Sequence, residues 1–327
     1  MKNILVTGGA GYIGSHTVYE LNKNGYNCII LDNFSEGHRK FVEGHKIYEI
    51  DLCDTKSVRT IFTENNIDAV IHFAASAYVG ESVQNPQKYY KNNVINTLNL
   101  LNIMREFNVN RIVFSSTCAT YGVAQYLPID ENHPQNPINP YGKTKLVIEN
   151  IMKDYDKAYG LKFIALRYFN AAGANVEANL GEFHKNDPHI IPNILKTITG
   201  EKDCITVLGT DYDTPDGTCI RDYTNVIDLA KAHAKALELL LHNPQSTCIN
   251  LGTGHGISIK ELINTTEEVT RKKIPITYGQ RRAGDPDALY ASYDKAKELL
   301  DWMPEHDIKS SIKSALEWEQ RLYSKTH

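Results

Sequence analysis

Short apolar runs alternate with longer amphipathic stretches through the first half of the chain. Apolar side chains gather in strand-like runs at Asn3–Thr7, Cys28–Leu31, Lys46–Ile50, Ala69–Phe73, Arg111–Phe114 and Phe163–Leu166. Between these runs, apolar positions recur with helical spacing in Tyr12–Asn24, Thr55–Asn65, Tyr89–Phe107 and Tyr141–Tyr159. Strands separated by helices of this length predict βαβ units. The expected fold class is therefore α/β, a doubly wound parallel sheet with helices on both faces.

The second half has a weaker rhythm and longer connections. Four prolines make Val123–Pro140 a loop, because proline lacks an amide hydrogen and clashes with the preceding helical turn. After Asn170, long loops are expected at Gly173–Pro188 and Thr210–Thr218. We therefore divide the chain into a first unit, residues 1–170, and a smaller second unit, residues 171–327.

The composition excludes several classes of protein. The length of 327 residues matches about two domains, and 42% hydrophobic residues allow a sizeable core. A net charge of −4 without charged blocks argues against a nucleic-acid partner. The six cysteines are scattered, with no CxxC pair, so neither a zinc site nor a disulfide framework is expected. Apolar runs fall short of the roughly 20 residues that span a membrane, and no signal segment precedes the first strand. We expect a cytoplasmic protein.

The first predicted strand runs directly into a glycine-rich turn. Gly8, Gly11 and Gly14 form a GxxGxxG pattern that opens the first predicted helix. These glycines suit a tight turn, close approach of a pyrophosphate and close helix–strand packing, in that order. A glycine triplet alone is also compatible with an ordinary turn. Asp32, at the end of the second strand, adds a carboxylate for ribose hydroxyls, and together they predict a Rossmann domain in residues 1–170.

The same segment bears on the choice between two dinucleotides. A carboxylate such as Asp32 binds both ribose hydroxyls and repels a 2′-phosphate, which favours NAD over NADP. Arg39 and Lys40 follow closely, and positive charges at this place would favour NADP. We expect NAD, with NADP as the alternative.

A second group of polar residues combines a tyrosine, a lysine and a threonine. Tyr141 and Lys145 are four apart at the start of a predicted helix, so their side chains share one face. A tyrosine of ordinary pKa, about 10, is a poor base, but a nearby ammonium and a positively charged nicotinamide would lower that pKa. Thr117, at a strand end, supplies a hydroxyl to hold a substrate oxygen in line. The Tyr/Lys spacing alone would also fit a solvated helix face, but with the dinucleotide motif it predicts proton transfer.

These motifs resemble the extended short-chain dehydrogenase/reductase family, and within it the UDP-hexose 4-epimerases, along nearly the whole chain. The resemblance is carried by Gly8–His16, Leu31–Asn33, His72–Ala75, Val79–Val83, Tyr89–Val94, Phe114–Gly122, Asn139–Leu146, Arg167–Gly173, Asp216–Tyr223 and Arg281–Pro286. It implies a seven-stranded sheet, a smaller carboxy-terminal UDP-sugar domain, and a chain that re-enters the first domain near residues 222–250. It also implies an isomerase that interconverts UDP-glucose and UDP-galactose through transient oxidation at carbon 4, with NAD staying bound. Epimerisation of a UDP-pentose or UDP-uronic acid is an alternative.

The resemblance assigns roles residue by residue. Catalysis is implied for Thr117, Tyr141 and Lys145. NAD contacts are implied for Gly8, Gly11, Tyr12, Ile13, Gly14, Asp32, Asn33, Asp51, Leu52, Phe73, Ala74, Asn92, Tyr141, Lys145 and Phe169. UDP-sugar contacts are implied for Thr117, Tyr141, Asn170, His189, Ile190, Val207, Arg221, Tyr223, Arg282, Asp285 and Leu289. The two arginines suit a diphosphate because guanidinium groups donate paired hydrogen bonds, although either would also fit a surface ion pair.

Several positions depart from the pattern of some or many family members: Ala77 replaces lysine, Thr117 serine, Asn225 histidine and Leu289 tyrosine. The tyrosine fills space beside carbon 2 of the sugar in the members that have it. The smaller Leu289 therefore predicts room for a 2-acetamido group, and turnover of UDP-GlcNAc and UDP-GalNAc as well. Alternatively, Tyr290 or the Gly173–Pro188 loop refills this space.

Two other functions compete with epimerisation. A nucleotide-sugar 4,6-dehydratase shares the first half-reaction but needs an acid, usually a carboxylate directly after the active-site threonine. Here Cys118, Ala119 and Thr120 follow Thr117, so elimination lacks a general acid. A non-catalytic NAD-sensing regulator could share the fold without needing a Tyr/Lys pair.

The resemblance also implies a homodimer. In relatives, helices matching Tyr89–Phe107 and Tyr141–Tyr159 pair as a four-helix bundle. Both segments carry apolar residues beyond one sheet-facing stripe, namely Leu98, Leu101, Met104, Ile148, Ile151 and Met152. The alternative is a monomer in which all of these side chains face the sheet.

Overall fold

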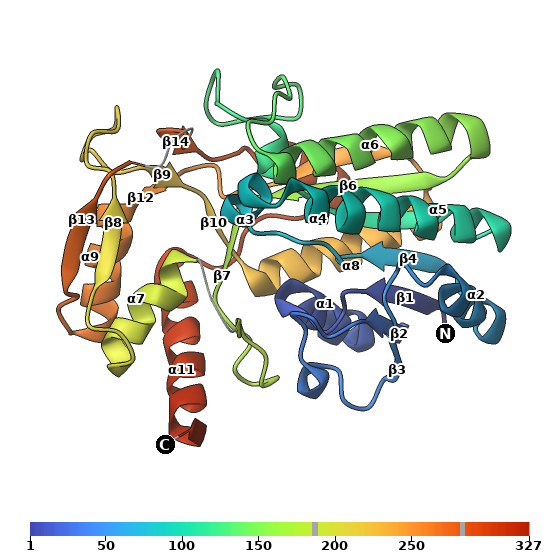
Figure 1. Cartoon of the computed structure of the whole chain (residues 1–327), viewed down its shortest axis with the longest axis horizontal. Helices are drawn as coiled ribbons and strands as arrows, with labels where there is room; N and C mark the ends of the chain where they lie inside the picture. Colours follow the sequence, from blue (N-terminus) through green and yellow to red (C-terminus); the bar gives the residue numbers. More distant parts are fainter. Residues whose placement is uncertain (185–188, 282–284, 327) are drawn as a thin grey trace.

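A seven-stranded parallel sheet forms the centre of the computed structural model, which describes residues 1–184, 189–281 and 285–326 (Figure 1). Its order is β11–β6–β5–β4–β1–β2–β3, with every neighbouring pair parallel. The strands are β1 (Asn3–Thr7), β2 (Asn27–Asp32), β3 (Lys46–Glu49), β4 (Ala69–His72), β5 (Arg111–Thr117), β6 (Lys162–Tyr168) and β11 (Thr247–Leu251). The chain order reverses between β1 and β4, so ligands are expected outside the carboxyl ends of these strands. The predicted doubly wound fold is confirmed.

Helices cover both faces of the sheet. One layer contains α1 (Tyr12–Lys23), α8 (Val226–His242) and α10 (Asp294–Leu300), and the other contains α2 (Thr55–Glu64), α5 (Asn96–Glu106) and α6 (Pro140–Tyr159) (Figure 1). Side chains alternate along β1, so Ile4 and Val6 join the first layer's core whereas Leu5 joins the second. Because both faces are buried, the strands read as nearly continuous apolar runs.

The predicted helix at Tyr89–Phe107 is interrupted. The short helices α3 (Val79–Gln84) and α4 (Pro86–Tyr89) precede a π-helical turn at Tyr90–Ile95, and only then does α5 begin. Asn93 lies in this wide turn, fully buried, and its amide donates to Ser76 O (3.0 Å) and Thr144 Oγ1 (3.1 Å). The hydrogen bonds of one buried asparagine thus accompany an irregularity that apolar spacing does not reveal.

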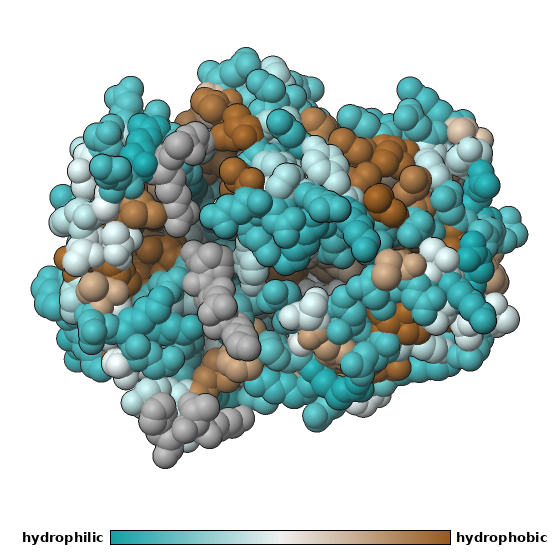
Figure 2. All heavy atoms as spheres, viewed as in Figure 1, coloured by the Kyte–Doolittle hydropathy of each residue, from teal (hydrophilic) through white to brown (hydrophobic). Residues whose placement is uncertain are grey.

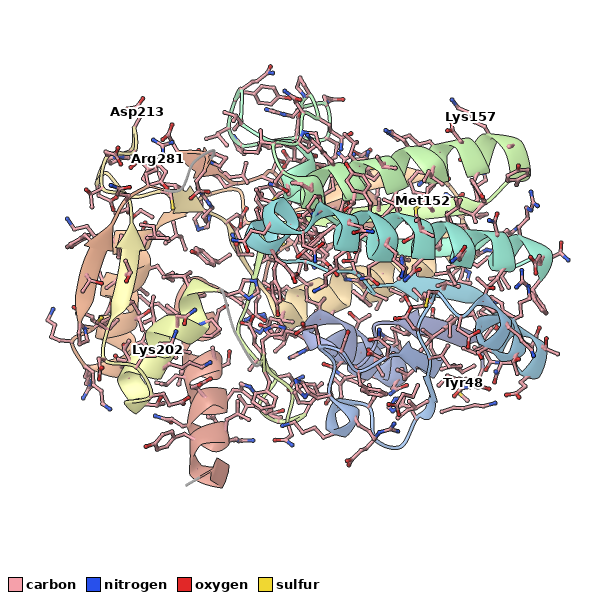
Figure 3. The ribbon with its side chains drawn as sticks, viewed as in Figure 1. Tyr48, Met152, Lys157, Lys202, Asp213 and Arg281 are labelled. Carbon is pink, nitrogen blue, oxygen red and sulfur yellow. The ribbon has the colours of Figure 1, made fainter. Side chains whose placement is uncertain are left out.

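Smaller elements make up the rest of the chain. The short sheets contain β7 (Asn170–Ala172) with β10 (Tyr223–Asn225), β8 (Ile205–Leu208) with β13 (Ile276–Gly279), and β9 (Ile220–Arg221) between β12 (Ile257–Ser258) and β14 (Ala288–Leu289). They pack with α7 (Ile190–Thr199), α9 (Ile259–Thr270) and α11 (Ile308–Thr326) around a separate core. In Figure 3, Lys202 and Arg281 mark this region and Met152 the sheet region. None of the described helices is both long and apolar enough to cross a membrane.

The apolar residues expected on a dimer face are mostly turned inward. Leu101, Met104, Ile148 and Met152 lie in the core between the helices and the sheet, each at most 1% exposed. The prediction that they extend beyond the sheet-facing stripe is wrong for these four, because α5 and α6 bury a wide face. Of the six, only Leu98 and Ile151 keep partial exposure.

Candidate active site

The glycines of the turn between β1 and α1 leave its backbone uncovered by side chains. Gly8 has φ of +69°, and a Cβ there would lie 2.6 Å from the backbone nitrogen of Ala74. A Cβ on Gly14 would lie 2.3 Å from Gly8 O. Gly11, the N-cap of α1, has no side chain to satisfy the first amides of the helix. The turn therefore presents backbone N–H groups and the positive end of a helix dipole, as an anion site requires.

Asp32 is tied to this turn through its carboxylate. Ala10 N donates to Asp32 Oδ2 (2.9 Å) and Phe34 N donates to Oδ1 (2.8 Å). Burial raises the pKa of Asp32, and these two hydrogen bonds act against that rise. Arg39 forms an ion pair with Glu49, and the Lys40 ammonium lies 4.5 Å from the centre of the Phe183 ring. The nearby cations thus have other partners, so the environment of Asp32 favours NAD over NADP.

The other predicted cofactor residues gather at neighbouring strand ends. Asn33 donates to Asp51 Oδ2 (2.7 Å) beside the buried Leu52, and Phe73 N donates to Thr7 O (2.9 Å) at the switch point. Asn92, in the π-helical turn, donates to Ser76 Oγ (3.1 Å). Tyr12 reaches across to Gly173 O (2.5 Å), and Phe169 packs beside Tyr121 and Leu289.

Thr117 and Tyr141 meet where β5 ends and α6 begins. Asn139 caps α6 by accepting from Gly142 N (2.8 Å), and Pro140 occupies the first turn, where its missing amide hydrogen is harmless. A Cβ on Gly142 would lie 2.3 Å from Ala119 O, so the helix start is pressed against the segment after β5. This close approach brings the Tyr141 hydroxyl near the side chain of Thr117.

Lys145 lies one helical turn further on and is 2% exposed. Its ammonium donates to Ser115 O (2.8 Å) and lies 5.9 Å from the centre of the Tyr141 ring. Burial lowers the pKa of Lys145 to about 7, although Glu149 opposes the shift. Tyr141, Lys145 and Thr117 are thus brought together as predicted from their spacing.

The pKa of Tyr141 departs from the expectation. Burial raises it to about 12, and the nearby Thr117 side chain offsets only part of that rise. The expectation that Lys145 lowers this pKa is not met in the protein alone, because desolvation of the phenolate dominates. A further positive charge is needed in the site before Tyr141 becomes a competent base.

A buried ion pair beneath α6 was not predicted. Arg167 donates to Glu149 through Nε (2.9 Å) and Nη2 (2.6 Å), and both side chains are at most 3% exposed. Ser116 and Gln135 also donate to the Glu149 carboxylate, at 2.5 and 3.1 Å. Glu149 follows Lys145 by four residues, so a carboxylate on the buried face of the helix was the available signal.

The predicted sugar residues lie partly together. Arg221 Nη2 donates to Asp285 Oδ1 (2.6 Å), and Leu289 pairs with Arg221 in the strand register. Asn170 donates to Asp222 O (2.8 Å) on the adjoining segment, next to Tyr223. Arg282 lies outside the described residues.

Three other predicted contacts lie on or next to β8 and α7. Val207 is 3% exposed and belongs to the core around α7, against which Ile190 also packs. His189 instead contacts Glu182, with Nδ1 2.6 Å from Oε1. Their assignment as sugar contacts stays a prediction.

The structure shows the surroundings of two residues that depart from the family pattern, Asn225 and Ala77. Asn225 caps α8 by accepting from Ile227 N (2.8 Å), and it donates to Ser311 Oγ on α11 (2.9 Å). It therefore joins three elements, away from the proton-transfer residues. Ala77 is exposed at the surface.

Fold and site together define a nucleotide-dependent protein of the short-chain dehydrogenase/reductase class. Residues 5–315 match the family described as GDP-mannose 4,6 dehydratase. The UDP-glucose 4-epimerase of Rhizobium leguminosarum bv. trifolii is 46% identical over 98% of both chains. The chain belongs to the UDP-glucose 4-epimerase family.

Solved structures agree along the whole length. The UDP-glucose 4-epimerase of Brucella ovis in complex with NAD is 47% identical, covers 97% of this chain and 98% of its own, and has a TM-score of 0.94. The UDP-Glc/GlcNAc 4-epimerase of Campylobacter jejuni is 40% identical, with 98% and 100% coverage and a TM-score of 0.85.

Proposed function

We propose that this protein interconverts UDP-glucose and UDP-galactose by epimerisation at carbon 4, using bound NAD. The observation that carries the proposal is the position of Tyr141 beside Thr117 and the buried Lys145, at the carboxyl end of a sheet that also holds a glycine turn. The 46–47% identity to named UDP-glucose 4-epimerases over nearly the whole chain supports it.

The residues around the switch point fit NAD. A Cβ at Gly8 or Gly14 would fill the bare turn, and the Asp32 carboxylate lies beside it to accept from ribose hydroxyls. When bound, NAD supplies a hydride acceptor and donor for carbon 4 of the sugar. The positive charge of the nicotinamide would also stabilise the Tyr141 phenolate and so lower the raised pKa of Tyr141.

The protein's own groups then handle the proton and the sugar. Tyr141, as phenolate, accepts the proton of the 4-hydroxyl group, and Thr117 holds that oxygen in line. Lys145 stabilises the phenolate. Arg221, freed from Asp285, donates to the diphosphate, and this anchor lets the 4-keto sugar turn over before reduction on its other face. Tyr141 finally returns the proton to the 4-oxygen. Because carbon 4 also regains the hydride that it lost, no net redox change occurs.

The work is divided between two regions. We assign cofactor binding to residues 1–170 together with the segment near 222–250, and sugar binding mainly to the remainder of 171–327. The strand β11, which extends the main sheet beside β6, supports this division. Six unpaired cysteines, two of them buried, support placement in a reducing cytoplasm.

The competing functions lack chemical support. A 4,6-dehydratase needs an acid after Thr117, but Cys118 follows, and burial raises the pKa of its thiol to about 12. The family description that names a dehydratase therefore indicates shared ancestry rather than elimination. A regulator would have no use for the buried Lys145 beside Tyr141.

The deciding experiment is incubation of the purified protein with UDP-galactose, followed by proton NMR of the sugar. We expect conversion to a mixture with UDP-glucose, without added NAD and without NADH release. A 4-keto-6-deoxy product would identify a dehydratase, stoichiometric NADH a dehydrogenase, and binding without turnover a regulator.

A homodimer is proposed through the outer faces of α5 and α6. Ile95, at the start of this surface, is 53% exposed and Val147 is 38% exposed, with Leu98 and Ile151 partly exposed beside them. Figure 2 shows apolar side chains gathered over this part of the molecule. Light scattering of Ile95→Lys should show monomers and wild type dimers, while Val123→Lys, an exposed loop control, should stay dimeric. A monomeric wild type would contradict the proposal.

A second activity on 2-acetamido sugars is favoured by the surroundings of Leu289. This side chain packs with Tyr121 and Phe169 and near Cys118, the residue after Thr117. Tyr290 does not refill the space, because its ring lies on the other side of the strand, against Gly256. The name of the Campylobacter jejuni relative includes UDP-GlcNAc, in agreement with this proposal.

A further inference from the structure

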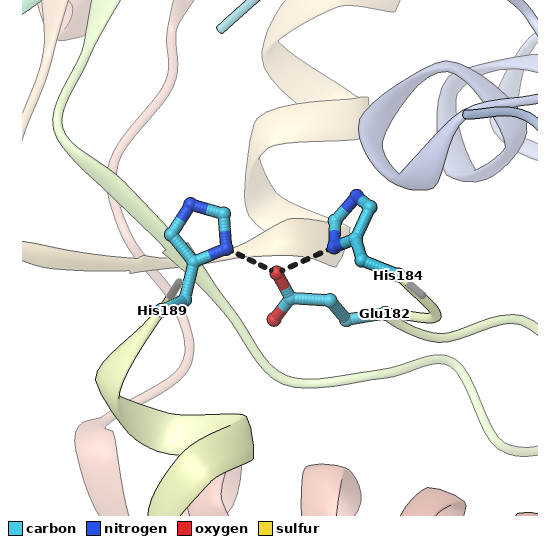
Figure 4. Close-up of side chains that lie close together, drawn as sticks. All are labelled: Glu182, His184 and His189. Carbon is cyan, nitrogen blue, oxygen red and sulfur yellow. Dashed lines mark hydrogen bonds and ion pairs between the residues drawn. The ribbon is translucent and has the colours of Figure 1, made fainter. Parts of the chain in front are cut away.

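Three side chains of types that commonly bind metal ions lie close together between β7 and α7. Glu182, His184 and His189 bring a carboxylate oxygen and two imidazole nitrogens within 4.8 Å of one another (Figure 4). The Glu182 Oε1 atom lies 2.6 Å from His189 Nδ1 and 3.3 Å from His184 Nδ1. A carboxylate only accepts hydrogen bonds, so both Nδ1 atoms point their protons at one oxygen.

Two of the three ligand separations are close to those of a zinc site, and the third, between the two histidines, is within 4.8 Å. Tetrahedral Zn²⁺ holds nitrogen and oxygen ligands at about 2.0–2.1 Å, which sets neighbouring ligand atoms roughly 3.3 Å apart. The contact between Glu182 and His184 already has this length. The contact between Glu182 and His189 has to open by roughly 0.7 Å, within the reach of side-chain rotation at a 49% exposed histidine. Two histidines and one carboxylate are a ligand set that zinc accepts with one position left open.

The backbone that carries the cluster is held in place on several sides. Trp318 Nε1 on α11 donates to Glu182 O (2.7 Å), and a Cβ on Gly181 would lie 2.4 Å from the Trp318 ring. The ring of His38 forms a hydrogen bond with Phe183 O (2.7 Å). Glu182 is 10% and His184 14% exposed, so two ligands are preorganised and partly shielded. Fixed ligands lower the entropic cost of binding an ion.

We propose that Glu182, His184 and His189 bind one divalent transition-metal ion, Zn²⁺ in the first instance, with a fourth position open to water. The ion replaces the two Nδ1 protons that now bridge to Glu182. It links the segment after β7 to the first turn of α7. Occupation of this site does not depend on the proposed epimerase activity.

Zinc binding is measured with ZnCl₂ alone on the full chain, by calorimetry and by elemental analysis after gel filtration. Cys53 and Cys204 are exposed thiols that could take up zinc, so the measurements use a Cys53→Ser/Cys204→Ser background. We expect one equivalent of zinc in this background. Glu182→Gln and His184→Gln should each weaken binding at least about tenfold, because loss of an outer-shell partner alone costs 10–100-fold. His242→Gln, an exposed histidine at the end of α8, should bind like its parent.

Two outcomes would overturn the proposal. One is zinc uptake at trace level in the Cys53→Ser/Cys204→Ser background, which would leave the cluster as a hydrogen-bonded clamp. The other is equal zinc affinity in the parent, Glu182→Gln and His184→Gln. Thermal unfolding in the absence of metal shows that the variants fold. UDP-sugar turnover is assayed separately, so failure of the proposed function and failure of the metal site are distinguishable.

Discussion

The proton-transfer region and the sugar region of this protein are built in opposite ways. Tyr141 and Lys145 sit on a 20-residue helix packed against the main sheet, and the polar groups beneath it form a connected network. Arg221 and Leu289 sit on strands of two residues each, joined by loops. The residues proposed for proton transfer, a step common to many substrates, thus lie on a rigid helix. In the proposed mechanism the particular sugar is recognised by residues on short strands and loops, which tolerate substitution better than a packed helix does.

Burial has different consequences in the two regions. In the first, it lowers the pKa of Lys145 to about 7 and raises that of Tyr141 to about 12, so the pair needs a bound positive charge to act. In the second, burial does not neutralise Arg221, because Asp285 and nearby groups raise the pKa of the guanidinium. In the proposed mechanism the first region therefore depends on the charge of its cofactor, whereas Arg221 in the second region carries its own charge.

The largest expected effect tests the first region directly. Tyr141→Phe removes only the proton acceptor, so kcat should fall by roughly 10²–10⁴ while the fold is retained. Tyr155→Phe, on the same helix, removes the hydroxyl that donates to Asn102 (2.8 Å) and should keep its turnover. A Tyr141→Phe protein with wild-type kcat would remove Tyr141 from the mechanism.

Glu149→Ala tests whether the buried network holds the helix in place. Arg167 would then remain as an unpaired buried cation, which should lower the free energy of unfolding by about 3–5 kcal/mol. The matched control is Glu106→Ala, which breaks an exposed pair with Arg59 (2.7 Å) and should change little. Urea unfolding of both variants measures the difference, and equal midpoints would show that the buried pair does not stabilise the region.

Leu289→Tyr probes the sugar region. If the leucine leaves room for a 2-acetamido group, the added ring should cost about 1–3 kcal/mol for N-acetylated substrates, a loss of roughly 5- to 150-fold in kcat/KM. The values for UDP-glucose and UDP-galactose should stay within about threefold, since only steric fit changes. Equal losses for both substrate pairs, or no turnover of UDP-GlcNAc by the wild type, would exclude this residue as the determinant.

The last prediction concerns stability in acid, which should depend on histidines packed around the main sheet. Burial lowers the pKa of His16 and His233 to about 4 and that of His72 to about 3. The unfolded chain protonates these groups near pH 6.5 and the folded chain does not, so stability present above pH 6.5 is lost as the pH falls toward 4. Three such groups give a slope of roughly 4 kcal/mol per pH unit at most.

His233→Gln isolates one of these protons. Chemical unfolding at several pH values between 6.5 and 4.5 should show a slope reduced by about 1.4 kcal/mol per pH unit. His255→Gln removes an exposed histidine in the second region and serves as the control. A slope for His233→Gln that matches wild type would mean that His233 is not protonated on unfolding in this range.

Local patterns allowed much of the fold to be predicted from the sequence. β1 has the predicted bounds, Asn3–Thr7, because its apolar run ends abruptly at Gly8. The Tyr141/Lys145 pair was predictable since helical spacing alone places both on one face. Such patterns depend only on neighbours in the chain.

Features that depend on distant partners were not predictable. Glu149 on helix α6 pairs with Arg167 on strand β6, and the sequence around Glu149 does not indicate that partner. The π-helical turn depends on Asn93 reaching Ser76 and Thr144. The inward orientation of Met152 follows from how deeply α6 is buried, which apolar spacing does not measure.

The position of β11 has a consequence for synthesis on the ribosome. The outer edge of β6 pairs with Thr247–Leu251, and α8 packs on α1 from more than two hundred residues away. Until residue 251 has emerged, the nascent chain exposes an unpaired strand edge and the apolar face that α8 later covers. Contacts of such long sequence separation form slowly, and open edges invite pairing with other chains. Chaperone demand during translation should therefore peak while the second region is still being made.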